Sequence, residues 1–269
     1  MAEEFVTHEK KGNILYLSLN RPDKRNAISF EMIDTISGIV DDSINDPDIR
    51  VIVLRGEGPM FSAGVDLNSL AGLVGRFNAD SAAGGASIRA DINKYQNLIN
   101  RLETIEIPII SVMHNRVLGL ALELVLASDI RLMSSECVWG MLELKFGVIA
   151  DLGGTTRLGR LIGTSRAMEV LMTRRTYTAE QALQWGLVNY IYPEEELFAE
   201  ADKMAEEIAA TAPIAVGATK RIIKKGESVD IMTQLDMEAN LQSILLRSDD
   251  FKEGIQAMIE SRTPEWKRR

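Results

Sequence analysis

Residues 107–133 read IPIISVMHNRVLGLALELVLASDIRLM, a strand, a helix and a second strand in close succession. Ile107 to Met113 and Ile130 to Met133 are short apolar runs, which are typical of buried strands. Leu118 to Ala127 lies between them and predicts a helix. Strands that alternate with helices form a sheet with crossover helices, so this stretch predicts an α/β fold.

The N-terminal part shows the same alternation. Phe5 to Glu9 and Ile14 to Leu19 predict a hairpin, because Gly12 and Asn13 between them favour a turn. From Ser29 the apolar residues have helical spacing, with Ser29 itself as the expected N-cap, and residues 45–47 (Asn-Asp-Pro) end this helix. Val51 to Leu54 then predicts a buried parallel strand.

Further along the chain, helices dominate. Leu70 to Ala86 is rich in Gly, Ala, Ser and Asn and has no clear period, which predicts an irregular segment. Ile88 to Ile105 predicts a long amphipathic helix. After about residue 160 the pattern is helical almost throughout, with helices expected at 166–173, 178–185, 194–211, 214–224, 230–247 and 250–262.

The composition narrows the possible functions. With 269 residues the chain suffices for one large domain, or for a core domain with a small C-terminal appendage. Its net charge of −9 makes nucleic acid an unexpected partner. No apolar run approaches the ~20 residues of a membrane span, and the N-terminus resembles neither a signal nor a transit peptide. Cys137, the single cysteine, excludes an internal disulfide and suits a reducing compartment, so we expect a cytoplasmic protein. His8, His114 and Cys137 have no metal-ligand spacing, so no metal is expected.

Three segments contain the candidate chemistry, and the first is Phe61 to Leu67. Its small residues allow backbone to approach a ligand closely. Helix-like sequence follows, so the N–H groups around Val65 would lie at a helix start, unpaired and with the helix dipole behind them. Alternatively, this is a tight strand-to-helix turn in which Asp66 is only an N-cap.

The second segment is Asn115 to Leu124. Gly119 is expected to open a helix, and the N–H of Leu120 in the first turn could donate to an oxyanion. Glu123 lies one turn further, where a carboxylate among apolar neighbours is costly unless it is paired or functional. The alternative is a solvent-facing glutamate or a partner for Arg116.

The third segment, residues 139–154, places two carboxylates eight positions apart in an apolar, glycine-punctuated loop. Proton transfer requires acids whose pKa values differ, and Glu143 and Asp151 would supply such a pair. Taken singly, Glu143 could instead be a surface ion-pair partner and Asp151 a helix cap.

Together and in this order, these segments resemble the crotonase family of enoyl-CoA hydratases and isomerases. The resemblance begins at residues 19–28 (LNRPDKRNAI), and includes residues 61–67, 119–124 and 143–158. Residues 163–167, 182–188 and 251–255 continue it, so it covers about residues 5 to 266. Several ordered blocks at consistent spacing make the signal far stronger than a single motif.

The resemblance implies a fold and an assembly. The fold would be an α/β spiral of ββα units, with the acyl-CoA site in residues 1–200 and a helical trimerisation region in 201–269. Homotrimers, or hexamers built as dimers of trimers, are expected. The N–H groups of Val65 and Leu120 would form the oxyanion hole for the thioester carbonyl.

The resemblance also implies roles for single residues. Glu123 and Glu143 match the two catalytic glutamates of the hydratases. Phe251 and Lys252 would reach the nucleotide end of CoA, from a neighbouring subunit. CoA is part of the substrate, and no separate cofactor is expected. The residues expected to bind CoA or substrate are Arg25, Ala27, Ala63, Gly64, Asp66, Leu67, Gly119, Phe251 and Lys252.

Three departures from the hydratase pattern leave the reaction open. Leu120 stands in what is usually a glycine cluster, and Asn115 replaces a common glycine, although Asn tolerates a left-handed backbone. Asp151 occupies a position where hydratases have a small residue and dienoyl-CoA isomerases have an acid. The isomerases, in turn, usually have Asp where this chain has Glu123. The interpretations are therefore a 2-enoyl-CoA hydratase, a 3,5-2,4-dienoyl-CoA isomerase that uses Glu143 and Asp151, and a non-catalytic CoA-ester binding protein; other reactions of the fold also remain open.

Overall fold

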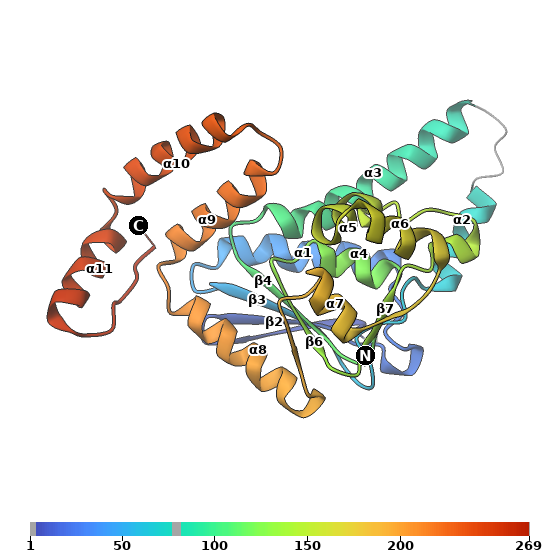
Figure 1. The fold of residues 1–269 in the computed structure, drawn as a ribbon, viewed down its shortest axis with the longest axis horizontal. Helices are drawn as coiled ribbons and strands as arrows, with labels where there is room; N and C mark the ends of the chain where they lie inside the picture. The colour runs from blue at the N-terminus through green and yellow to red at the C-terminus, as the bar shows by residue number, and fades with distance from the viewer. Residues whose placement is uncertain (1–3, 77–81, 269) are drawn as a thin grey trace.

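The computed structural model describes residues 4–76 and 82–268 (Figure 1). Its main sheet has the strand order β1-β2-β3-β4-β6-β9. β1 and β2 pair antiparallel as the predicted hairpin, and every later pair in this sheet is parallel. The strands are β1 (Val6–Lys11), β2 (Ile14–Leu19), β3 (Val51–Gly56), β4 (Ile109–Met113), β6 (Ile130–Ser134) and β9 (Tyr190–Tyr192).

A smaller second sheet has the order β5-β7-β8, formed by β5 (Arg116–Leu118), β7 (Val138–Gly140) and β8 (Tyr177–Thr178). Two strand-strand-helix units connect the sheets. β4, β5 and α4 (Leu120–Leu126) form one, and β6, β7 and α5 (Gly154–Ile162) form the next, with a short 3-10 turn, Glu143–Phe146, before α5. In each unit the first strand joins the large sheet and the second joins the small one, which is the expected spiral of ββα units.

Local chemistry explains where the first helices begin. α1 (Phe30–Asn45) starts at the predicted cap, because the Ser29 hydroxyl accepts the N–H of Met32. The prediction of an irregular segment at Leu70 to Ala86 was wrong for the described residues. Residues 70–76 belong to α2 (Leu67–Arg76), and residues 82–86 belong to α3 (Ala82–Thr104). Small residues give a weak apolar period but do not prevent a helix, and Ala is the best helix former. Residues 77–81 of that segment lie outside the described residues.

Both faces of the large sheet are covered, as a parallel sheet requires. On one face α1, α3 and α4 enclose the larger core, which includes Ile36, Leu54 and Phe61. On the other face α8 (Glu194–Ala209) packs Leu197 and Ala201 against β2, β3, β4 and β6 (Figure 1).

The C-terminal half is largely helical, as predicted, with α6 (Thr164–Thr173), α7 (Ala179–Trp185), α9 (Pro213–Gly226), α10 (Ile231–Leu245) and α11 (Asp249–Glu260). The prediction missed β5, β7, β8 and β9, which have only two or three residues each and are too short to show a period. The predicted division at residue 200 falls inside α8, which packs on the sheet. α9 packs against α3, where the buried Lys220 donates to the Leu102 carbonyl, and α10 and α11 extend away from the core (Figure 1). No helix in the described part of the chain is both long and apolar enough to cross a membrane.

Candidate active site

The first two predicted segments lie side by side. The Ser62 N–H donates to the Arg116 carbonyl (3.0 Å), and the Leu118 N–H donates back to Ser62 (3.3 Å). Gly64, at φ +103°, touches the second segment so closely that a Cβ added there would lie 2.7 Å from the Leu118 carbonyl oxygen. Only glycine suits this position, for its φ and for the close approach.

This juxtaposition brings two backbone donors to one place. The N–H groups of Val65 and Leu120 have no acceptor among the residues that the structure describes. Leu120 is the first residue of α4, whose N-cap Gly119 has φ +53°. The turn before it also forms as predicted, because Asn115 adopts φ 53°. Unpaired N–H groups at a helix start are suited to binding a developing negative charge.

Glu123 is the most deeply buried of the predicted acids, at 2% exposure. Its Oε1 accepts the N–H groups of Leu152 and Gly154, both at 2.9 Å. Burial and the nearby Glu143 and Asp151 raise the pKa of Glu123 to about 8, although the two N–H bonds act in the opposite direction. Because Glu123 is buried and bonds to Leu152 and Gly154, it is neither a solvent-facing residue nor a partner for Arg116.

Glu143 lies in the 3-10 turn, and its carboxylate lies against Gly119. A Cβ added to Gly119 would be 2.7 Å from Glu143 Oε1, so glycine makes room for the carboxylate. Glu143 Oε2 is buried and has no partner in the described residues. Burial raises the pKa of Glu143, and Asp151 adds to the shift. Glu143 is therefore not a surface ion-pair residue.

Asp151 is half-buried in the turn that precedes α5. Burial raises the pKa of Asp151. The N-cap of α5 is Gly153, and no side chain caps that helix, so Asp151 does not act as the cap. The three acids thus come from α4, from the 3-10 turn and from the turn before α5.

All three acids line one cavity of about 1000 Å³. Val65, Gly119 and Leu120 line it as well, so the predicted oxyanion donors and the acids share a single space. Two smaller hollows, of about 560 and 600 Å³, lie among α9, α10 and α11 and contain none of the three acids.

The predicted CoA-binding residues divide into two groups. Ala27, Ala63, Gly64, Leu67 and Gly119 line the cavity, whereas Arg25, Asp66, Phe251 and Lys252 do not.

The residues away from the cavity have other environments. Arg25 is exposed, and its carbonyl accepts the N–H of Ala63. Asp66 caps α2 through the N–H groups of Asn68 and Ser69 and pairs with Arg21 at 2.9 Å, which agrees with the alternative role of a cap. Phe251 and Lys252 lie on α11, on the far side of the molecule (Figure 1).

The sequence did not single out several residues that form the cavity wall. Phe30 and Tyr95 stack with ring centroids 4.6 Å apart. Ile88 and Ile92 of α3 also line the cavity. The exposed side chains of Phe146, Val148 and Ile149 line it too, and these three belong to the third predicted segment. The helical spacing of Ile88, Ile92 and Tyr95 placed them on one face of α3, but nothing in the pattern indicated that this face borders a ligand cavity.

Unpaired N–H donors and acids of raised pKa in one cavity are the features expected of an enzyme that stabilises an oxyanion and moves protons with carboxylates. The Enoyl-CoA hydratase/isomerase family model matches residues 9–269. The chain belongs to this family, and it is an acyl-CoA enzyme, a lyase or an isomerase. The interpretation as a non-catalytic binding protein is therefore not retained.

The similar proteins carry out more than one reaction. The probable mitochondrial enoyl-CoA hydratase of Dictyostelium discoideum is 34% identical over 262 residues, 97% of this chain and 90% of the relative. The peroxisomal Delta(3,5)-Delta(2,4)-dienoyl-CoA isomerase of Arabidopsis thaliana is 30% identical over 264 residues, 97% of this chain and 95% of the relative. The crystal structure of an enoyl-CoA hydratase from Bacillus anthracis superposes with a TM-score of 0.89 at 30% identity, covering 99% of this chain and 100% of that one.

Proposed function

We propose that the enzyme adds water to a 2-enoyl-CoA, with Glu123 and Glu143 as its acid-base pair. The observation that carries the proposal is the position of both glutamates around the start of α4. Glu143 lies against Gly119, and Glu123 lies one turn beyond Leu120. A thioester oxygen bound by the Leu120 N–H would therefore share one cavity with both carboxylates.

The backbone donors account for the electrostatic part of the reaction. Addition of water at C3 of an enoyl thioester moves negative charge onto the thioester oxygen. The Val65 and Leu120 N–H groups have no other acceptor in the described residues and would receive this charge. Each such donor is worth roughly 3 kcal/mol in the transition state, by analogy with a measured oxyanion donor.

The carboxylates would supply the proton transfers. One glutamate in its ionised form removes a proton from the attacking water, and the other in its protonated form delivers a proton to C2. The pKa of Glu123, raised to about 8, fits an acid that exchanges protons near neutral pH, and burial raises the pKa of Glu143 as well. These steps use only side chains of this protein, and CoA is part of the substrate.

A second candidate reaction is favoured by Asp151. This acid lines the same cavity, and its charge contributes to the raised pKa of Glu143. With a 3,5-dienoyl-CoA, Glu143 and Asp151 could move a proton along the conjugated chain while the same N–H groups hold the enolate.

The assembly we propose is a homotrimer or a dimer of trimers formed through the C-terminal helices. Apolar side chains of α10 and α11 are exposed in the single chain, among them Met258, at 79%. Burial of such a surface against a second copy is favourable. In a trimer, Phe251 and Lys252 would contribute to the CoA site of a neighbouring subunit.

The test is a paired ultraviolet assay with a 2-enoyl-CoA and a 3,5-dienoyl-CoA. Loss of enoyl absorbance with a 3-hydroxyacyl product supports the hydratase, and a gain of 2,4-dienoyl absorbance supports the isomerase. Glu123→Gln should abolish hydration, Asp151→Asn should abolish only isomerisation, and Glu143→Gln should abolish both. Glu136→Gln, an exposed acid in the turn between β6 and β7, is the matched control. If Glu143→Gln retains wild-type turnover on every accepted substrate, the assignment of the acids is wrong.

A further inference from the structure

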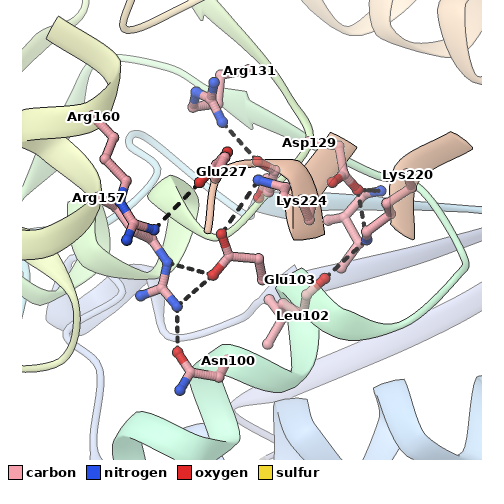
Figure 2. A network of polar contacts seen from close by, with 12 residues as sticks. Asn100, Leu102, Glu103, Asp129, Arg131, Arg157, Arg160, Lys220, Lys224 and Glu227 are labelled. Carbon is pink, nitrogen blue, oxygen red and sulfur yellow. Dashed lines mark hydrogen bonds and ion pairs between the residues drawn. The ribbon is translucent and has the colours of Figure 1, made fainter. Parts of the chain in front are cut away.

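A cluster of charged side chains joins α3, α5 and α9 (Figure 2). Arg157 of α5 is at its centre and is only 7% exposed. Its Nε donates to Glu103 Oε2 at 2.9 Å, and its terminal nitrogen lies 2.8 Å from the same oxygen. That nitrogen also donates to Asn100 Oδ1. Lys224 of α9 approaches the other oxygen of Glu103, at 3.4 Å.

The guanidinium of Arg157 also contacts the turn that holds the buried glutamate. Its third nitrogen donates to the Leu152 carbonyl at 3.3 Å. It also lies over Gly153, where an added Cβ would be 1.8 Å from that nitrogen. Gly153 therefore needs to be glycine for this approach as well as for its φ of +117°.

The same turn also binds Glu123. The N–H groups of Leu152 and Gly154 both donate to Glu123 Oε1 at 2.9 Å. Leu152 thus accepts a hydrogen bond from Arg157 and donates one to Glu123. A change in the position of Arg157 would move the peptide groups that orient the glutamate.

We propose that Arg157 is a positioning residue of the reaction, which fixes the turn of residues 151–154 so that its N–H groups hold and orient Glu123. The inference rests on the proposed function, since it concerns the orientation of an acid assigned to catalysis. Glu103 and Asn100 hold the guanidinium from α3, and Lys224 connects the cluster to the first of the C-terminal helices.

The chemistry of the cluster requires arginine. A planar guanidinium donates in several fixed directions, and here it serves a carboxylate, an amide oxygen and a carbonyl together. Although burial raises the pKa of Glu103, the charges of Arg157 and Lys224 lower it below the ordinary value, so Glu103 is ionised and anchors the guanidinium. A lysine at position 157 would keep the charge but could not maintain this geometry.

The charged groups that face Glu123 define the expected pH effect. In the described residues these are Glu143 from the 3-10 turn and Asp151 from the turn before α5, and both raise the pKa of Glu123. The two N–H bonds of the turn lower it. Loosening the turn weakens the two N–H bonds and also displaces Asp151, which belongs to the same turn, so the pKa of Glu123 should change.

The experiment compares Arg157→Lys with Arg160→Met in the full-length enzyme. Arg160 is on the same helix and pairs with Glu227, the C-cap of α9. In the described residues it forms no hydrogen bond or ion pair with the turn of residues 151–154, which makes it the matched control. In Arg157→Lys we expect kcat to fall about 10- to 100-fold with KM changed less than about threefold, because misplacement by ~1 Å costs up to about 10²-fold. The pH profile of kcat in Arg157→Lys should be displaced from the wild-type profile by about 0.5–1 pH unit.

A second readout does not depend on turnover. Hydrogen exchange, measured by mass spectrometry on a peptide of residues 150–156, should be faster in Arg157→Lys and unchanged in Arg160→Met. Glu103→Gln keeps the shape of its side chain and should produce the same changes more weakly, which covers the case in which Arg157→Lys does not fold.

Unchanged exchange and an unchanged pH profile in folded Arg157→Lys and Glu103→Gln would overturn the inference. Equal kinetic changes in Arg160→Met would also overturn it, because they would indicate a general effect on α5. Failure of the proposed function is distinguishable, because it would appear as absence of hydration and isomerisation in the wild-type enzyme. In that case the exchange experiment would still decide whether Arg157 holds the turn.

Discussion

Replacement of Gly64 by alanine tests whether the two backbone donors depend on the contact between their segments. The new Cβ would lie 2.7 Å from the Leu118 carbonyl oxygen, whereas ordinary contact begins at 3.4 Å, so the backbone must yield by about 0.7 Å. Gly64 directly precedes the donor Val65, and Leu118 lies two residues before the donor Leu120. The displacement therefore separates the two N–H groups that would bind the thioester oxygen.

The magnitude follows from this displacement. A misplacement of ~1 Å at a reacting centre lowers turnover by up to about 10²-fold, and loss of one oxyanion donor costs about 10²–10³-fold in kcat. We therefore expect kcat of Gly64→Ala to fall roughly 100-fold, with a smaller change in KM, because the donors act mainly on charge that develops in the transition state. The φ of +103° adds strain of about 1–3 kcal/mol to the folded state.

The assay is steady-state kinetics on the substrate accepted in the ultraviolet test, combined with urea unfolding of each variant. Gly38→Ala is the matched control, since this glycine of α1 has no heavy atom within 4 Å of the added Cβ and no positive φ. A folded Gly64→Ala enzyme with kcat within threefold of wild type would refute the view that this contact sets the oxyanion hole.

Three further predictions concern stability. The pKa of Glu123 is raised from 4.5 to about 8 in the folded state, so between these pH values the folded protein keeps a proton that the unfolded chain releases, and its stability falls as pH rises. In urea unfolding, Glu123→Gln should therefore gain stability relative to wild type as pH rises from 4.5 to about 8. A difference that stays constant with pH would contradict the raised pKa. Lys220→Met removes the buried ammonium group that lies 2.7 Å from Asp129. Chemical unfolding should show that the free energy of unfolding falls by about 3–5 kcal/mol, because the buried carboxylate is left without its ion-pair partner. A fall of less than about 1 kcal/mol would be incompatible with this pairing. Asn26→Ala removes a fully buried side chain that accepts the N–H of Arg21 and donates to the carbonyls of Glu57 and Met60. Calorimetry should show that the free energy of unfolding falls by about 3 kcal/mol. An unchanged Tm would show that these hydrogen bonds do not stabilise the fold.

Local patterns predicted much of the fold because their causes are local. The apolar runs at residues 51–54 and 130–133 became central parallel strands, since a strand buried on both faces needs continuous apolar residues. Ser29 capped α1 as expected, because its hydroxyl needs only an N–H three residues away. Leu70 to Ala86 failed as a prediction because small residues leave the choice between helix and loop to the surrounding structure.

The candidate site was predicted in part. Glu123, Glu143 and Asp151 were identified as acids out of place in apolar sequence, and the structure places them in one cavity. Asp66 belonged to the same small-residue segment as Val65, but its side chain is engaged by Arg21 and by the start of α2. Neighbouring side chains of an extended segment point in opposite directions, and the composition of the segment does not show which of them faces the cavity.

By itself, the sequence determined the longer strands and most of the helices, the α/β class and the presence of buried acids, because these follow from hydrophobic periodicity and from the cost of charge in an apolar helix. Only the tertiary structure decided which residues meet. The contact between Gly64 and Leu118, the stacking of Phe30 on Tyr95, and the clamp from Arg157 to Glu103 join residues that are 54 to 65 positions apart. Such contacts depend on how the completed spiral packs its layers, and no local spacing specifies that packing.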